Sequence, residues 1–172
     1  MPRLDRLDAE IIGRLTRNAR AGVVELASAI GVARNTVQAR LRRLEETGIV
    51  RGFRPDVDLE SVGLPVQAFV EVELDQRRMA YVVKAITQLP EVLEIVTQAG
   101  RADLHVRVAA VSHAELQEVV VRIIDTEGVR HTTTTLAIST PLPYRVQPIL
   151  DKITRERGYG RSTPPPTDPL VE

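Results

Sequence analysis

The stretch VVELASAIGVARNTVQARLRRL, Val23–Leu44, decides how the first part of the chain folds. Apolar residues recur there at helical spacing on both sides of Gly31. They are Leu26, Ala27, Ile30, Val37, Leu41 and Leu44. Gly31 can adopt the positive φ that a tight turn between two helices requires. The stretch therefore predicts two short helices joined by a turn, a helix-turn-helix.

The second of these helices has an outward face that is polar and basic. Residues 34–43 contain four arginines and no acid, whereas an ordinary solvated face mixes both signs. Asn and Gln can bond adenine edges, Arg can bond guanine, and a flanking Arg can hold phosphate. We therefore expect Arg43 mainly to hold phosphate and most of the other side chains to read bases. The candidate DNA-binding residues are Arg34, Asn35, Thr36, Gln38, Arg42 and Arg43.

Charge is segregated along a chain whose net charge is zero. Residues 1–54 carry a net charge of +5 and the remainder carries −5, as expected if only the first third meets a polyanion. The chain has no cysteine, which excludes disulfides and thiolate chemistry. No stretch approaches the ~20 apolar residues of a membrane span. We expect a cytoplasmic protein without a cofactor or metal, and a DNA-binding domain at 1–54.

The segments around the helix-turn-helix complete this domain. Asp5 or Asp8 can cap a first helix whose apolar stripe suits packing on the next two. The stripe consists of Leu7, Ile11, Ile12 and Leu15. Residues 49–54 are predicted to form a short strand, which would make the three-helix domain winged-helix-like. Residues 55–65, which begin and end with proline, are the expected linker.

A second pattern begins at Val66, where apolar and polar residues alternate as in a strand with one buried face. Helical spacing follows at 79–89, strand patterns at 92–99 and 104–108, a helical stripe at 116–124 and a strand at 132–139. The order is β-α-β-β-α-β, a ferredoxin-like antiparallel sheet domain at 66–140, so the fold class is α+β. Both helices would cover one face of the sheet. A second copy of the chain is the simplest cover for the other face, which predicts a homodimer.

Composition changes again after residue 140, where a C-terminal extension, 141–172, begins. Seven of the eleven prolines lie between Pro141 and Pro169. Residues 149–157 can form one short helix, and residues 158–172 have no periodic apolar face, which predicts disorder. Truncation after Arg157 is accordingly expected to leave stability and DNA affinity unchanged.

With these features in place, the chain resembles the leucine-responsive/asparagine-regulator (Lrp/AsnC, feast/famine) family of bacterial transcription factors. The resemblance covers roughly Leu4 to Thr140. It rests on LDRLDAEIIGRL at Leu4–Leu15, on ELASAIGVARNTVQARLRRLEETGIVRGF at Glu25–Phe53, and on AGRAD at Ala99–Asp103. The first two motifs are a strong signal together, and the third is weak alone.

The resemblance implies that the N-terminal domain binds double-stranded operator DNA. It also implies that the sheet domain dimerises, assembles into tetramers or octamers, and binds a small effector, commonly an amino acid, between subunits. Gly100, Arg101 and Asp103 would lie at that effector site. Two residues depart from the pattern: Ala33 stands where a capping Ser is usual, and Leu104 stands where an aromatic is frequent.

Two alternative functions remain open on the sequence. Some sirohaem decarboxylases look like these regulators, and His105, His113 and His131 would then be candidates for acid-base work or ligation. Their spacing matches no metal motif, and the intact basic helix argues against this interpretation. The other alternative is an architectural DNA-binding protein, which would share the basic face and respond to no effector.

Overall fold

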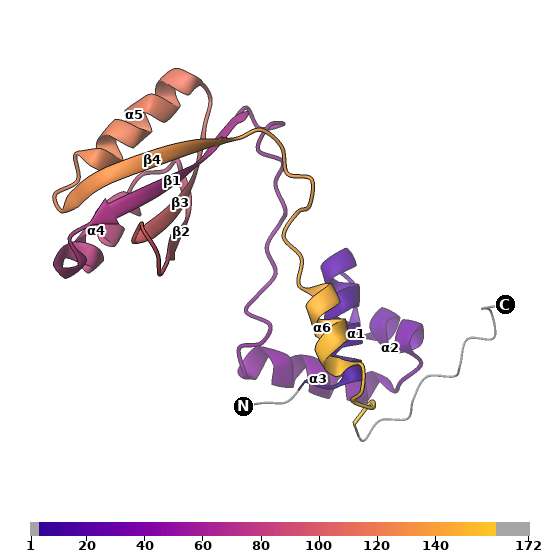
Figure 1. Ribbon diagram of the computed structural model, residues 1–172. Helices are drawn as coiled ribbons and strands as arrows, with labels where there is room; N and C mark the ends of the chain where they lie inside the picture. Colours follow the sequence, from indigo (N-terminus) through magenta and orange to yellow (C-terminus); the bar gives the residue numbers. More distant parts are fainter. Residues whose placement is uncertain (1–3, 161–172) are drawn as a thin grey trace. The chain divides into compact units, whose positions relative to one another are not determined.

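The computed structural model of the protein describes residues 4–160 and shows two compact units (Figure 1). One unit contains residues 4–55 together with 143–160, and the other contains residues 56–142. The first unit is helical and the second is built on one antiparallel sheet. This is the predicted α+β class, a three-helix helix-turn-helix domain followed by a β-α-β-β-α-β domain.

Three helices form the centre of the first unit: α1 (Arg6–Arg17), α2 (Val23–Ile30) and α3 (Arg34–Glu46). Asp5 caps α1, and its side chain accepts from the backbone N–H of Asp8 while the Asp8 side chain accepts from that of Asp5. Both predicted acids therefore take part in the cap, as a capping box. Gly31 ends α2 with φ 79°, the left-handed conformation expected of the turn. The core consists of Leu7, Ile11, Leu15, Leu26, Ala27, Ile30, Val37 and Leu44.

A sixth helix, α6 (Gln147–Thr154), belongs to this same unit and packs against α1. The short helix expected at 149–157 is present, two to three residues earlier than its pattern indicated. Residues 143–160 of the C-terminal extension belong to the helical unit. Of the segment expected to be disordered, residues 158–160 are described, and Tyr159 packs on the helical core. Residues 161–172 lie outside the described residues.

The strand predicted at 49–54 is wrong. These residues form no regular element, and Ile49 and Val50 instead pack partly buried against the helical core. A strand needs a hydrogen-bonded neighbour, and within residues 4–55 and 143–160 there is no strand to supply one. The first unit is therefore a three-helix domain without a wing, extended by α6.

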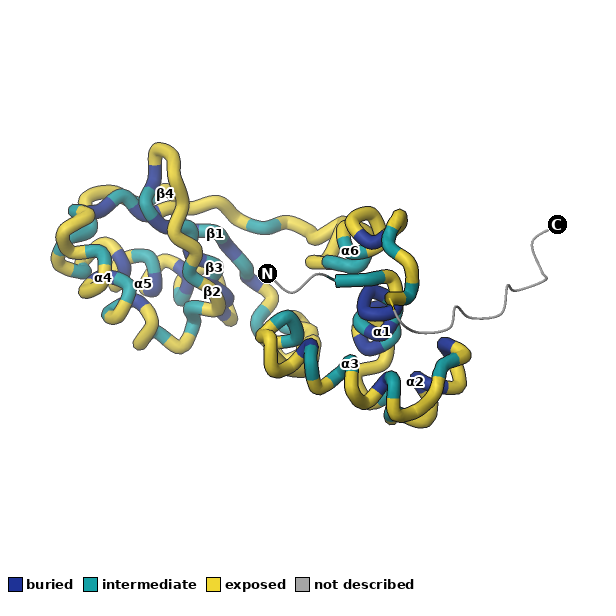
Figure 2. Tube along the Cα trace, turned by 90° about the horizontal axis from the view of Figure 1, so that it is seen from below, coloured by how far each residue is buried: buried dark blue, intermediate teal, exposed yellow. Residues whose placement is uncertain are grey.

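The second unit contains four strands in the spatial order β2-β3-β1-β4, with every neighbouring pair antiparallel. The strands are β1 (Val66–Leu74), β2 (Val92–Thr97), β3 (Leu104–Ala110) and β4 (Val129–Ala137). A 3-10 turn η1 (Gln76–Arg78), α4 (Met79–Ile86) and α5 (His113–Ile124) complete the unit. Figure 2 shows buried residues along β1 and β3 and a largely exposed β4.

Both helices cover one face of the sheet. Val82 and Ile86 of α4, and Leu116, Val119 and Ile123 of α5, share one core with the inward residues of β1 and β3. The other face carries Phe69, Glu71 and Glu73 of β1. The strand register sets Phe69 opposite Arg107 and Thr135, and Glu71 opposite His105. The sheet is thus covered on one side within the chain, as the alternation in β1 predicted.

Candidate DNA interface and effector site

The exposed face of α3 carries four of the six candidate DNA-binding residues. Arg34, Asn35, Gln38 and Arg42 are exposed, while Val37 and Leu44 are buried in the helical core. Burial of Val37 fixes which side of the helix faces solvent, because residues one helical turn apart share a face. Thr36 is half-buried at the edge of this face. The four exposed side chains form one polar surface, the recognition face.

Arg43, the sixth candidate, lies beside the recognition face, on the same side of α3 as Thr36, and is engaged within the chain. Its guanidinium pairs with the carboxylate of Asp8, which is fully buried. The other oxygen of Asp8 accepts from Arg40 at 3.0 Å, and Arg40 also pairs with Asp5. We call Asp5, Asp8, Arg40 and Arg43 the α1–α3 ion cluster. It ties the recognition helix to α1 through two arginines, so those two are not free in the way that Arg34 and Arg42 are.

The cluster changes the electrostatic environment of Asp5. Partial burial acts to raise the pKa of this carboxyl group. The hydrogen bond from Arg40, with further help from the backbone N–H of Asp8 and the Arg40 charge, outweighs burial and holds the pKa below its ordinary value. Asp5 therefore remains ionised in the folded protein, both as helix cap and as ion-pair partner.

Sequence reasoning missed Arg40 and assigned Asp8 only to capping. Arg40 was counted among the basic residues of the helix, and its distance of 32 residues from Asp8 left no local signal of the pair. The one available clue was the helical phase of Arg40, which lies one turn from Val37 and Leu44 and is therefore close to the core side.

The three candidate effector residues lie in or beside the loop between β2 and β3. Asp103 ends that loop, where its carboxylate accepts from the Leu74 backbone N–H at 2.9 Å and from the Gln76 side chain at 3.2 Å. Its own N–H donates to the carbonyl oxygen of Val72 at 2.9 Å. Asp103 thus joins the loop to the end of β1 through hydrogen bonds to residues about 30 positions earlier in the chain.

Gly100 and Arg101 have fewer contacts within the chain. Arg101 is highly exposed, and its Nε lies 3.4 Å from a carboxylate oxygen of Glu73. Gly100 does not adopt a left-handed conformation, and a Cβ built there would meet no atom within 4 Å. Within residues 4–160, neither the backbone conformation nor the packing therefore requires glycine at this position.

The three histidines do not come together. The His105 ring stacks on Phe69 with a centroid distance of 4.9 Å, and His131 lies 3.5 Å from the Thr133 hydroxyl. His113 is exposed at the first residue of α5. Among residues 4–160, no group of three or more His, Cys, Asp or Glu side chains could hold a metal ion.

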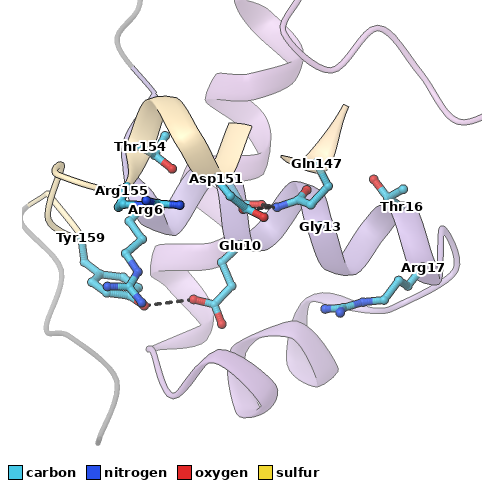
Figure 3. A pocket seen from close by; sticks show the side chains of 11 residues that line it. Arg6, Glu10, Gly13, Thr16, Arg17, Gln147, Asp151, Thr154, Arg155 and Tyr159 are labelled. Carbon is cyan, nitrogen blue, oxygen red and sulfur yellow. Dashed lines mark hydrogen bonds between the residues drawn. The ribbon is translucent and has the colours of Figure 1, made fainter. Parts of the chain in front are cut away.

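A groove of about 660 Å³ lies within the helical unit, between α1 and the C-terminal segment (Figure 3). Arg6, Glu10, Gln147, Asp151 and Tyr159 are among the residues that line it. The two sides of the groove are far apart in the sequence and have no shared pattern, so sequence reasoning did not find it.

Comparison with known proteins agrees with the two-unit architecture. The AsnC-type helix-turn-helix domain matches residues 4–45, and the Lrp/AsnC ligand binding domain matches residues 67–147. The chain belongs to the Lrp/AsnC family. Both Lrp/AsnC matches stop before most of α6, so residues 148–160 lie outside the two matched domains.

Individual Lrp/AsnC relatives support this assignment. The transcriptional regulator AldR of Mycolicibacterium smegmatis is 34% identical over 128 residues, which cover 73% of this chain and 75% of that protein. The structure of E. coli AsnC is 27% identical with a TM-score of 0.79 and covers 86% of this chain and 100% of that chain. B. subtilis LrpC is 26% identical with a TM-score of 0.76, covering 83% and 100%.

The protein is therefore a DNA-binding transcriptional regulator of the Lrp/AsnC type with a ligand-binding domain. Its relatives are regulators and not enzymes, so we set the decarboxylase interpretation aside. Within residues 4–160, no helix is both long and apolar enough to cross a membrane.

Proposed function

We propose that this regulator reads its operator with the recognition face of α3 and that an amino acid effector, bound between subunits, changes how the DNA-binding units are spaced. The observation that carries the proposal is the recognition face itself. Arg34, Asn35, Gln38 and Arg42 are exposed together on the side of α3 that faces away from the core.

Each of these residue types can recognise a base edge. Asn35 and Gln38 can bond adenine through N6 and N7, and Arg34 and Arg42 can bond guanine through O6 and N7. Thr36, at the edge of the face, can donate to a phosphate. Arg43 keeps a phosphate role only in part, because one side of its guanidinium is held by Asp8.

The effector would bind near Gly100, Arg101 and Asp103. An amino acid presents an ammonium group and a carboxylate, which an Asp and neighbouring backbone N–H groups can recognise. The open space around Gly100 supports this site, because a glycine with no demand from its own chain suits the close approach of a ligand or second subunit. Asp103 already accepts hydrogen bonds from Leu74 and Gln76. It would therefore support the effector site by holding the shape of the loop as well as by its charge.

Calorimetry with the twenty amino acids on two variants tests whether Gly100 and Asp103 contact the effector. Gly100→Ala fits the chain, so it should keep the parent melting temperature and weaken effector binding. Asp103→Asn retains an oxygen that can accept from Leu74 and removes the charge, so weaker binding would assign the charge to the ligand. Unchanged affinity in both variants would place the effector elsewhere.

The oligomer is part of the proposal. The sheet face opposite α4 and α5 carries Phe69 and Val96 among polar side chains, and a second copy packed there would form a dimer. Tetramers or octamers could be built from it. A symmetric dimer would present two recognition helices to half-sites about one DNA turn apart, or a multiple of it. Cytoplasmic location, where such DNA lies, follows from the same proposal.

The decisive experiment is footprinting upstream of the protein's own and neighbouring genes, with and without each amino acid. An effector regulates only if it binds one assembly better than another. A footprint that shifts in extent or affinity with one amino acid supports the proposal. A footprint that no amino acid alters would instead favour the architectural protein, which shares the DNA face and has no effector.

A further inference from the structure

The C-terminal segment follows α1 along its length and contacts it from α6 onwards. Near one end, the Gln147 side chain donates to the carbonyl oxygen of Ala9 at 3.0 Å. The same side chain lies so close to Gly13 that a Cβ there would approach it to 2.8 Å. At the other end of the segment, Arg157 donates to the carbonyl oxygen of Leu4, just before α1, at 2.9 Å. We call residues 147–160 the strap.

Tyr159 is the main side-chain anchor at the far end of the strap (Figure 3). It is half-buried against the helical core, the Arg6 guanidinium lies 5.3 Å from its ring centroid, and its hydroxyl donates to Glu10 at 3.2 Å. Burial, followed by the negative charge of Glu10, raises the pKa of the hydroxyl. The backbone N–H of Arg6 also donates to the carbonyl oxygen of Gly158 at 3.3 Å. Ring, hydroxyl and backbone thus all hold the strap on α1.

The strap ends on the α1–α3 ion cluster. Arg40 donates to the carbonyl oxygen of Tyr159 at 3.5 Å. Gly160 adopts φ 66°, and a Cβ there would lie 2.6 Å from an Asp5 oxygen and 2.8 Å from an Arg40 nitrogen. Arg40 of the recognition helix therefore contacts α1 through the two acids and the strap through the carbonyl.

We propose that the strap is a positioning element for DNA recognition, which holds α3 against α1 through Arg40 and so sets operator affinity. Gln38 and Arg42 lie two residues on either side of Arg40 on the same helix. Base contacts require placement to within about 0.5 Å, so a change in how Arg40 is held alters the contacts of its neighbours. The strap lies outside the matched family domains except for its first residue.

The strap also gives the sheet unit a second connection to the helical unit. The chain passes from α3 to β1, and then returns from β4 to α6, which packs on α1.

The test uses the full-length chain and single substitutions at Tyr159. Tyr159→Ala removes the stacking and the hydrogen bond, and the milder Tyr159→Leu keeps apolar packing in case the first variant does not fold. Tyr144→Ala is the matched control, because Tyr144 precedes the strap and is 93% exposed. Operator affinity is measured at a temperature where circular dichroism shows each variant fully folded.

We expect Tyr159→Ala to weaken operator binding about tenfold, the loss that follows from disturbing one base contact, and Tyr159→Leu to fall between it and the parent. Tyr144→Ala should bind as the parent does. Parent-like affinity in both Tyr159 variants overturns the proposal. A lower melting temperature with unchanged operator affinity also overturns it, because the strap would then stabilise the unit without positioning α3.

Two truncations give an independent result. Ending the chain after Arg157 removes Gly158, Tyr159 and Gly160 together with their contacts. Contrary to the expectation from the sequence, this truncation should weaken operator binding at least as much as Tyr159→Ala does. Ending it after Gly160 keeps every described strap contact and should bind as the full chain does. Equal affinity of the two truncated proteins would contradict the proposal, and so would a loss that appears only on removal of residues 161–172.

Discussion

The four arginines of α3 fall into two groups, according to whether or not they pair with Asp8. Its buried carboxylate binds Arg40 and Arg43, while Arg34 and Arg42 remain exposed and, within residues 4–160, pair with no acidic side chain. A buried carboxylate with two arginine partners keeps its charge compensated. The first pair therefore holds the helix in place, and the second pair is available to DNA.

The first prediction compares two neighbours in sequence. Arg42→Ala should cost on the order of 1–3 kcal/mol of operator binding and relax sequence preference at one position, with little change in stability because the side chain is exposed. Arg43→Ala should instead lower the free energy of unfolding, because Asp8 loses one of its partners. Binding isotherms on operator variants and urea unfolding distinguish the two. Equal effects of both substitutions on both measurements would contradict this division.

The second prediction concerns acid stability and follows from Asp5. A carboxyl group whose folded pKa is depressed stabilises the protein at pH above its unfolded pKa, and that contribution disappears as pH falls through the folded pKa. The ordinary value is 3.8 and the folded value lies below it. Asp5→Asn, which can still cap α1, should therefore be less stable than the parent near pH 6, with the difference closing below about pH 4.

Unfolding by urea across this pH range checks the prediction. Glu46→Gln is the matched control, because Glu46 is exposed at the end of α3. The free energy of unfolding of Glu46→Gln should differ little from that of the parent at every pH. A gap between Asp5→Asn and the parent that stayed constant down to pH 2 would show that ionisation of Asp5 has no part in it.

At the scale of the element, α3 begins without a side-chain cap. Ala33 occupies the N-cap with extended backbone, and no side chain there accepts from the first turn. Ala33→Ser should supply the missing acceptor and raise the free energy of unfolding by about 1 kcal/mol. Thermal unfolding measures the gain, with Ala39→Ser in the exposed middle of the helix as the control, which should be neutral or destabilising. A lower melting temperature for Ala33→Ser would contradict the prediction.

At the scale of the whole molecule, we propose that the uncovered sheet face forms the dimer interface. Phe69 lies on this face, stacked with His105, and a second copy would bury both. We expect light scattering to give at least twice the 19.1 kDa chain mass at micromolar concentration. Phe69→Glu should lower that mass, whereas Val121→Glu, on the exposed side of α5, should leave it unchanged. A parent protein of 19.1 kDa would rule the dimer out.

The sequence by itself determined most of the helices and strands and the exposed polar face of α3. Gly31, the apolar positions of α3 and the alternation in β1 act over a few residues, and local periodicity records such preferences directly. The helix-turn-helix, the β-α-β-β-α-β order and the fold class were accordingly predicted and are confirmed. The exposure of Arg34, Asn35, Gln38 and Arg42 followed from the same periodicity.

Only the tertiary structure decided which polar groups meet across the chain. Asp8 and Arg40 are 32 residues apart, and Glu10 and Tyr159 are 149 apart, so no local pattern connects them. The tail looked unable to gain from ordering because it has no apolar stripe, yet one tyrosine with an arginine, a glutamate and backbone partners holds its first part on α1. The strand expected at 49–54 failed for the converse reason: its residues suit a strand, but a strand forms only where another lies beside it to share hydrogen bonds.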